Sequence, residues 1–291
     1  MARNYAECTR CGSTYEVSTM VGTAMPNRGG RMAYMCQRCA EHNEWYHTHN
    51  NKNRGVEKVN KIFVGHEYEV SYNDAYARNI LFEYGLIPTN DSSLRGRNTC
   101  EFVTGIQSGL NIASKMAVSI EALIEGGHLE INDSCGTHFH ISVDSMKDEN
   151  GNKTYMGYIA RFYHSLFVPL CEAMQSDRAK TERVFGRYFT SYAHTVDSHS
   201  DAADHYNFIN VRNDSNIEFR LNKFTSAKQM QNLMKMEVEM TKCIVANFCE
   251  HFMDTEWDRR RYPTRTAYRK HKAEVTASKL VKLYEKFSAN I

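Results

Sequence analysis

The sequence has little of what marks a membrane-spanning, fibrous or disordered chain. It has four prolines and two tryptophans among 291 residues, and no apolar run approaches the roughly 18 residues that a membrane helix requires. Residues 1–14 also lack the apolar core of a signal peptide. Apolar residues make up 42% of the chain and charged residues 24%, which excludes collagen-like and coiled-coil sequences. We therefore expect a soluble, cytoplasmic protein of about two domains with no membrane partner.

The chain has little net charge, but its charges are unevenly distributed. Its formal net charge is +2. Residues 1–58 carry 8 basic and 5 acidic side chains, residues 59–257 carry 18 and 26, and residues 258–291 carry 10 and 3. An acidic centre argues against a uniformly cationic nucleic-acid binder, and it fits a site where carboxylates bind cations.

Nine cysteines do not fit a disulfide framework, because their number is odd and the cytoplasm keeps thiols reduced. Four of them form two C-x-x-C pairs, Cys8 with Cys11 and Cys36 with Cys39. Four thiolates complete a tetrahedral shell around a structural Zn²⁺ ion, with a hairpin or loop between the pairs. We predict a zinc ribbon and linker over residues 1–58, similar to the ribbons that dock partners or read nucleic acids. Redox thiols or a chance spacing are the alternatives.

Three segments of residues 59–291 have the alternation of a β-strand, with ionisable side chains on one face and apolar ones on the other. They cover residues 62–70, 135–143 and 216–221. Their polar faces carry Glu67 and Glu69, then His138, His140 and Ser142, then Glu218 and Arg220. Each strand alone fits the solvated face of an antiparallel sheet. Together they offer the side chains of an oxygen-rich metal site beside a phosphate-binding arginine.

A fourth segment, residues 91–104, fits the same sheet. Glu101 lies between apolar neighbours, where a carboxylate is costly unless it is protonated, paired or bound to a cation. A metal-ligand role and an ion pair with Arg95 or Arg97 remain open for this residue. Asp91 fits a turn former.

In this order the motifs resemble the amidoligase family of the glutamine synthetase-like carboxylate–amine ligases. The matching stretches are Glu67-Tyr68-Glu69, residues 91–104, residues 135–142, and residues 206–210 leading into Glu218-Phe219-Arg220. The resemblance covers about residues 61–224 and leaves out the ribbon and the basic tail. It implies an α+β fold in which a curved, mainly antiparallel sheet is covered by helices. The concave face of such a sheet binds ATP with two or three Mg²⁺ or Mn²⁺ ions.

The resemblance also implies roles for individual residues. The metal ligands would be Glu67, Glu69, Glu101, His138 and Glu218. His140 and Ser142 would lie near the nucleotide phosphates, and Arg220 would face the transferred phosphoryl group, which makes Glu218 and Arg220 the catalytic pair. Asn207 and Arg212 would contact substrate. Relatives of glutamine synthetase have a second acid near the position of Glu101, and here only Asp91 is available, so the number of metals stays open.

The expected activity joins a small-molecule or peptide carboxylate to an amine. Phosphorylation by ATP turns the carboxylate into an acyl phosphate that an amine can attack. Divalent ions and a planar arginine would manage the phosphate charge. The sequence has no P-loop and no dinucleotide-binding fingerprint, so nucleotide binding must come from the sheet.

Two other functions fit parts of the sequence. A cupin-like enzyme would bind one ion with His138, His140 and a later acid, which leaves Glu67, Glu69 and Arg220 unexplained. A zinc-ribbon adaptor with an idle ligase-like domain would bind nucleic acid or protein through the ribbon and the basic tail. That tail includes residues 259–261, Arg265 and Lys272, and it also fits the solvated side of a terminal helix.

The remaining segments are predicted to be scaffold. Residues 108–125, 155–175 and 227–253 have apolar residues at helical spacing. Cys135 falls on the face opposite the histidines, which favours a packed core thiol over a nucleophile. Arg187 lies in a polar, loop-like stretch that is suited to closing over a substrate.

Overall fold

The computed structural model describes residues 5–7, 14–24, 32–36, 62–83, 86–89, 93–96, 98–104, 107–143, 156–197, 199–202, 204, 206–211, 216–248 and 260–289. Within these ranges no helix combines the length and the apolar character needed to cross a membrane.

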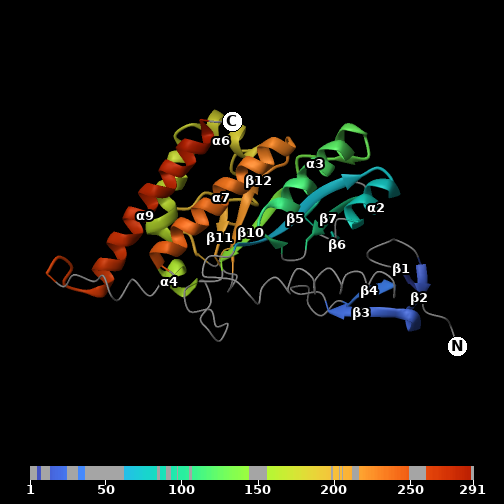
Figure 1. Ribbon diagram of the computed structural model, residues 1–291, viewed down its shortest axis with the longest axis horizontal. Helices are drawn as coiled ribbons and strands as arrows, with labels where there is room; N and C mark the ends of the chain where they lie inside the picture. The colour runs from blue at the N-terminus through green and yellow to red at the C-terminus, as the bar shows by residue number, and fades with distance from the viewer. Residues whose placement is uncertain are drawn as a thin grey trace. The chain divides into compact units, whose positions relative to one another are not determined.

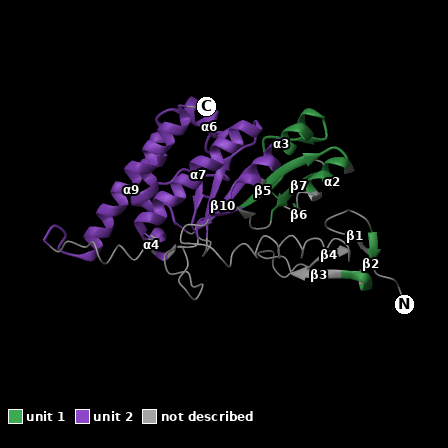
Figure 2. Cartoon of the chain, viewed as in Figure 1, with its two compact units in different colours: residues 1–56, 65–108, 119–135 green, residues 57–64, 109–118, 136–291 purple. Residues whose placement is uncertain are grey.

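The chain forms two compact units (Figure 2). One comprises Met1–Val56, Gly65–Ser108 and Ser119–Cys135, and the other comprises Glu57–Val64, Gly109–Val118 and Gly136–Ile291. The predicted domain boundary near Lys58 falls in residues 37–61, which are outside the described ranges. It therefore stays a prediction.

The first unit contains two short hairpins and part of a larger sheet. Strands β1 (Tyr5–Glu7) and β2 (Thr14–Glu16) pair antiparallel, as do β3 (Met20–Ala24) and β4 (Met32–Cys36), and the 3-10 turn η1 (Val17–Thr19) lies between the hairpins. In the larger sheet, β5 (Ile62–Tyr72) pairs antiparallel with β7 (Thr99–Val103) and with β9 (Leu129–Glu130), and β7 pairs with β6 (Ile87–Thr89). The helices here are α2 (Ala75–Glu83) and the part of α3 (Asn111–Glu125) from Ser119 onward, whereas its first half belongs to the second unit.

In the second unit, helices pack against antiparallel strands. Strand β12 (Ile217–Asn222) pairs with β10 (Thr137–Val143) on one side and with β11 (Ile209–Asn210) on the other. Helix α7 (Ala227–Phe248) packs on β10 and β12, and α9 (Arg265–Ser288) packs beside α7 and on α5 (Tyr163–Gln175) (Figure 1). The shorter helices are α4 (Met156–Arg161) and α6 (Arg178–Phe185).

The sheet is open, with the strand order β11-β12-β10-β5-β7-β6, and β9 and the short β8 (Gln107–Ser108) pair with β5 off this path. The pairings given above are all antiparallel. The α+β class and a mostly antiparallel sheet covered by helices are thereby confirmed.

The predicted alternation separates core from site along β10. Phe139, Ile141 and Val143 are buried, whereas His140 and Ser142 are only partly buried. Cys135, just before the strand, is fully buried, as expected of a core thiol. Apolar side chains of α7, among them Met230 and Leu233, are also fully buried. The apolar stripe of the helix thus packs on one sheet face and leaves the histidine face for the site.

Two of the predicted helices differ in extent from those observed. The segment 155–175 forms two helices, because Phe162 leaves helical geometry at φ −107° and ψ 18°. The segment 227–253 is helical as far as Phe248, and residues 249–259 are outside the described ranges.

Candidate metal centre

His140 and Glu218 lie directly opposite each other across the β10–β12 pair. Residues in this relationship have Cβ atoms about 4.5–5.5 Å apart, so their side chains meet on one face. His138, two residues earlier on β10, shares that face. Both His138 and Glu218 are 4% exposed, so the cluster is shielded from bulk water.

One carboxylate oxygen of Glu218 faces both imidazoles. Its Oε1 lies 3.8 Å from Nδ1 of His138 and 4.0 Å from Nε2 of His140. These separations exceed a hydrogen bond. They suit donors that share one ion, because ligand atoms each about 2.0–2.2 Å from a metal lie about 3–4 Å from one another.

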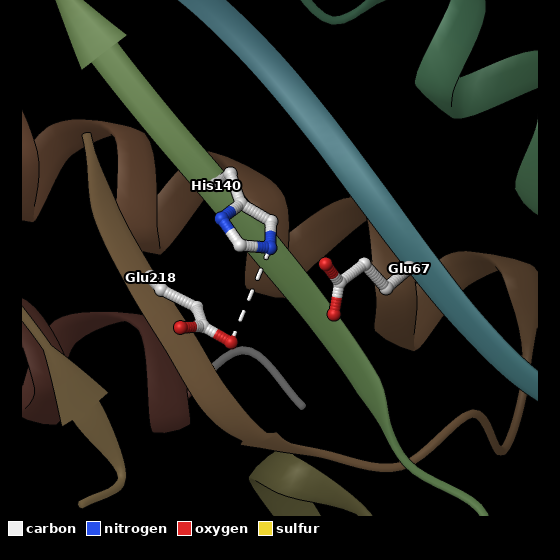
Figure 3. Close-up of side chains that lie close together, drawn as sticks. All are labelled: Glu67, His140 and Glu218. Atoms are coloured by element: carbon white, nitrogen blue, oxygen red, sulfur yellow. Dashed lines mark ion pairs between the residues drawn. The ribbon is translucent and has the colours of Figure 1, made fainter. Parts of the chain in front are cut away.

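Glu67 of β5 supplies the third ligand atom of a possible metal group. One ligand atom from each of Glu67, His140 and Glu218 lies within 4.8 Å of the other two. Figure 3 shows the two carboxylates directed toward the His140 ring, Glu67 from one side and Glu218 from the other. The group satisfies the donor preferences of Mn²⁺, Fe²⁺ or Zn²⁺, and its carboxylates suit Mg²⁺.

Hydrogen bonds with neighbouring residues fix the orientation of the His140 and Glu218 side chains. Nδ1 of His140 donates to Oδ1 of Asn216 over 3.2 Å, which leaves the lone pair of Nε2 toward Glu218. The Asn210 amide donates to Oε2 of Glu218 over 2.8 Å. Next to Asn210, the Ile209 carbonyl accepts a 2.6 Å hydrogen bond from the Tyr163 hydroxyl. Burial raises the pKa of Tyr163, so this hydroxyl keeps its proton and its role as donor.

Arg220 forms an ion pair with Oε1 of Glu218. The guanidinium therefore neutralises the carboxylate on the side where a cation would bind. A bound cation would compete with Arg220 for this oxygen, and Arg220 would then be released toward an anionic ligand. The prediction that Arg220 faces a phosphoryl group is compatible with this position and stays a prediction.

A second pair of carboxylates occurs within the first unit. Glu69 and Glu101 lie opposite each other in the β5–β7 register and are 6% and 9% exposed. Thr89 of β6 donates a 2.5 Å hydrogen bond to Oε1 of Glu101. Like charges directly opposite each other destabilise a strand pair unless a cation or a proton compensates them. A cation, a proton or a basic side chain could each supply this compensation, and the ligand roles of both residues stay predictions.

Two further predicted residues, Ser142 and Asn207, are not part of the possible metal group. Ser142 follows His140 at the alternating position of β10 and is partly buried. Asn207 is 1% exposed, and its amide donates to the Asp201 carbonyl over 2.7 Å, so in this structure it stabilises its own loop. Its predicted substrate contact remains untested.

Several predicted residues lie outside the described ranges. These are Cys8, Cys11 and Cys39 of the predicted zinc ribbon, together with Asp91 and Arg212. Cys36 is the last residue of β4, and nothing is described of its side chain. The hairpin of β3 and β4 lies between the two C-x-x-C pairs, where a hairpin or loop is predicted.

Sequence reasoning missed the role of Arg187. The β10–β12 register shifts by one residue, so that Arg220 and Leu221 together lie opposite His138. Arg187 donates from Nε to the Leu221 carbonyl over 3.0 Å and from Nη2 to the Arg220 carbonyl over 2.5 Å. The arginine thus holds the irregular stretch of β12 that presents Arg220. Closure of its segment over a substrate stays a prediction.

Gly136 makes room for Arg187, and Gly186 allows the tight turn just before it. A Cβ atom at Gly136 would lie 2.8 Å from its Nη2. Gly186, the C-cap of α6, has φ +76°, and a Cβ there would lie 2.3 Å from the Lys223 carbonyl oxygen. Gly136, the glycine of the C-G-x-H motif, was therefore the sequence signal that could have revealed the position of Arg187. A backbone that another group approaches this closely requires glycine.

No protein-family model matches this sequence, and a search of curated proteins finds no match either.

Proposed function

We propose that this chain is an ATP-dependent carboxylate–amine ligase that forms an amide or isopeptide bond with the help of Mg²⁺ or Mn²⁺. The observation that carries the proposal is the convergence of His138, His140 and Glu218 on one sheet face, with Arg220 paired to Glu218. The proposal is also supported by the order of the motifs, which resembles that of the amidoligase family. It includes a curved sheet of the glutamine synthetase type.

In this proposal Glu67, Glu69, Glu101, His138 and Glu218 hold the cations, and His140, which groups with Glu67 and Glu218, adds a further ligand atom. Bound divalent ions would neutralise phosphate charge, so that the γ-phosphoryl group of ATP can be transferred. Arg220 would stabilise charge on the migrating phosphoryl group through its planar guanidinium. Asn210 and Asn216 would hold Glu218 and His140 in place.

The reaction consumes one ATP for each bond formed. A carboxylate oxygen of the first substrate attacks the γ-phosphorus, which gives an acyl phosphate and ADP. The amine then attacks the acyl carbon, and inorganic phosphate leaves with the electron pair of the broken C–O bond. The amine releases one proton. The partly buried His140 and Ser142 would lie near the phosphates.

The test is ADP release from ATP over a panel of carboxylates and amines with Mn²⁺ or Mg²⁺ present. We expect turnover that needs both co-substrates, that EDTA abolishes, and that Glu218→Gln lowers by at least about 100-fold, as the loss of a catalytic electrostatic group does. The exposed Glu172 provides the matched control Glu172→Gln, which should leave turnover unchanged. Turnover that persists in EDTA or in Glu218→Gln would overturn the proposal.

A single-metal enzyme of the cupin-like kind is the second candidate. One nitrogen each of His138 and His140 lies 3.8 and 4.0 Å from the same carboxylate oxygen of Glu218, which fits the two-histidine, one-carboxylate set of non-haem iron sites. It predicts one tightly bound Fe²⁺ per chain and no ATP consumption. Measuring metal content together with ADP release separates the two candidates.

For the N-terminal segment we propose a structural Zn²⁺ ion bound by Cys8, Cys11, Cys36 and Cys39. Binding of this kind contributes about 10 kcal/mol or more to the folding of small ribbons. An adaptor role toward nucleic acid or protein would rest on this segment and the basic tail. We expect one Zn²⁺ per chain by elemental analysis, and its loss in Cys8→Ser.

A further inference from the structure

Helices α7 and α9 enclose an open groove of about 490 Å³ that is lined chiefly by lysines. Lys242 comes from α7, and Lys279, Lys282 and Lys286 come from α9. The only acid on the lining is Glu239, whose carboxylate pairs with Lys242 over 2.6 Å. The groove lies wholly within the second unit and contains no residue of the candidate metal centre.

The lysines are placed by helical spacing. Lys279, Lys282 and Lys286 are three and four residues apart, so they share one face of α9. All three are exposed, as is Lys242. Of the two acids on α9, Glu285 pairs with Lys180 of α6, and Glu274 lies about 140° around the helix from Lys279. Glu285 is thus engaged by a lysine of α6, and Glu274 lies on a different side of α9 from Lys279.

The floor of the groove adds no negative charge. It consists of Leu283 and Cys243, both partly buried. Burial raises the pKa of the Cys243 thiol, and the nearby Lys279 opposes this shift. The thiol therefore stays neutral at ordinary pH, and the field in the groove is set by the ammonium groups.

The length of the array indicates the size of its ligand. Lys279 and Lys286 are separated by about 10 Å along the helix axis at 1.5 Å per residue. The seven-residue spacing continues through Lys272 to Arg265, which extends the line to about 30 Å. A single phosphate would require cations that converge on one point, whereas a line of cations fits successive phosphates of a chain.

We propose that the α7–α9 groove binds the sugar–phosphate backbone of a nucleic acid. Lysine ammonium groups bind phosphates as point charges without reading bases. The lining has no aromatic residue for base stacking and no amide side chain for base edges, so binding should be independent of sequence. It also has no tryptophan or phenylalanine, and its one leucine, Leu283, does not make the broad apolar face with which amphipathic helices enter a lipid surface.

Salt dependence tests this directly. The full chain is titrated into a fluorescently labelled 20-nucleotide single strand, and anisotropy is measured from 50 to 200 mM NaCl. Four contacts on a single strand give a log–log slope of about −2.8, which is about a 50-fold loss of affinity over this range. Lys279→Gln with Lys282→Gln should halve the slope, leaving about a 7-fold loss. Lys115→Gln, at an exposed lysine of α3, should behave as the unchanged chain.

The outcomes are distinct. A halved slope in the double variant, with a second nucleic-acid sequence bound equally well, supports the groove. Retention of binding in Lys279→Arg with Lys282→Arg supports it further, because charge is kept. The same slope in the Gln double variant would place binding elsewhere and overturn the proposal. Binding to vesicles that contain anionic phospholipid, without binding to the oligonucleotide, would also overturn it.

Discussion

His140 of β10 and Glu218 of β12 are cross-strand partners, with the imidazole Nε2 4.0 Å from the carboxylate Oε1. The antiparallel register brings together two residues that are 78 positions apart in the chain. Because the opposite faces of both strands pack in the apolar core, neither side chain can turn inward without burying its polar atoms. The pairing therefore follows from the same alternation that folds the sheet.

The hydrogen bond from His140 to Asn216 should matter for metal binding. In Asn216→Ala the imidazole loses the acceptor that holds its proton on Nδ1. Loss of such an outer hydrogen bond lowers metal affinity by about 10–100-fold. We expect this weakening in a calorimetric titration with Mn²⁺, and no change in Asn79→Ala at an exposed asparagine of α2. Equal affinity in Asn216→Ala would show that this bond does not orient the ligand.

Gly136→Ala should disturb the irregular stretch of β12 through Arg187. The new methyl group would lie 2.8 Å from the guanidinium, which must move off the Arg220 and Leu221 carbonyls. Overpacking and lost hydrogen bonds of this kind cost about 1–3 kcal/mol. The measurement is urea denaturation. The control is Gly157→Ala in α4, where nothing lies within 4 Å, and it should unfold at the same or a higher urea concentration.

Backbone strain and steric clash can be separated at two glycines. Gly127 and Gly186 have nearly equal φ values of +75° and +76°, but only Gly186 has a carbonyl oxygen where a Cβ would lie. Gly127→Ala should therefore cost about 1 kcal/mol from the left-handed conformation alone. Gly186→Ala should cost more, because the α6 C-cap must also move away from Lys223. Equal losses of thermal stability in the two variants would contradict this explanation.

Glu237 should make stability depend on pH. Burial raises the pKa of this α7 carboxyl well above its usual range, and Asn222 offsets that shift only in part. In the unfolded chain the group ionises near pH 4.3. The folded state thus holds a proton that the unfolded state releases, so stability falls as pH rises from about 4.3 toward the raised pKa.

Replacing Glu237 with glutamine should remove that slope. Each pH unit in the window costs up to about 1.4 kcal/mol, or about 2–4 °C in melting temperature for a domain of this size. The melting temperature of Glu237→Gln minus that of the unchanged chain should therefore increase from pH 5 to pH 8. Glu172→Gln, at an exposed position, should follow the unchanged chain throughout. Parallel pH profiles for Glu237→Gln and the unchanged chain would show that Glu237 is ionised when folded.

Alternation along the chain was sufficient to predict the strands that carry the candidate centre. It placed His138 and His140 on the face opposite Phe139, and Glu218 and Arg220 opposite Phe219, because side-chain direction in a strand is set locally. The register, which puts Glu218 opposite His140, depends on pairing between distant segments and has no local signal. For the same reason Asn210, Asn216 and Arg187 could not be assigned, since each acts through a partner on another strand or loop.

Mn²⁺ binding to the intact chain and to Glu218→Gln, followed by electron paramagnetic resonance of the free ion, tests the centre most directly. We predict that the unchanged chain removes the free-ion signal at micromolar Mn²⁺. The glutamine variant, folded to the same extent by circular dichroism, should need an Mn²⁺ concentration at least about 100-fold higher. Loss of a ligand should lower the metal affinity by no less than loss of the hydrogen bond that supports a ligand. Identical titration curves for the two proteins would contradict the assignment of a divalent-cation site to this face of the sheet.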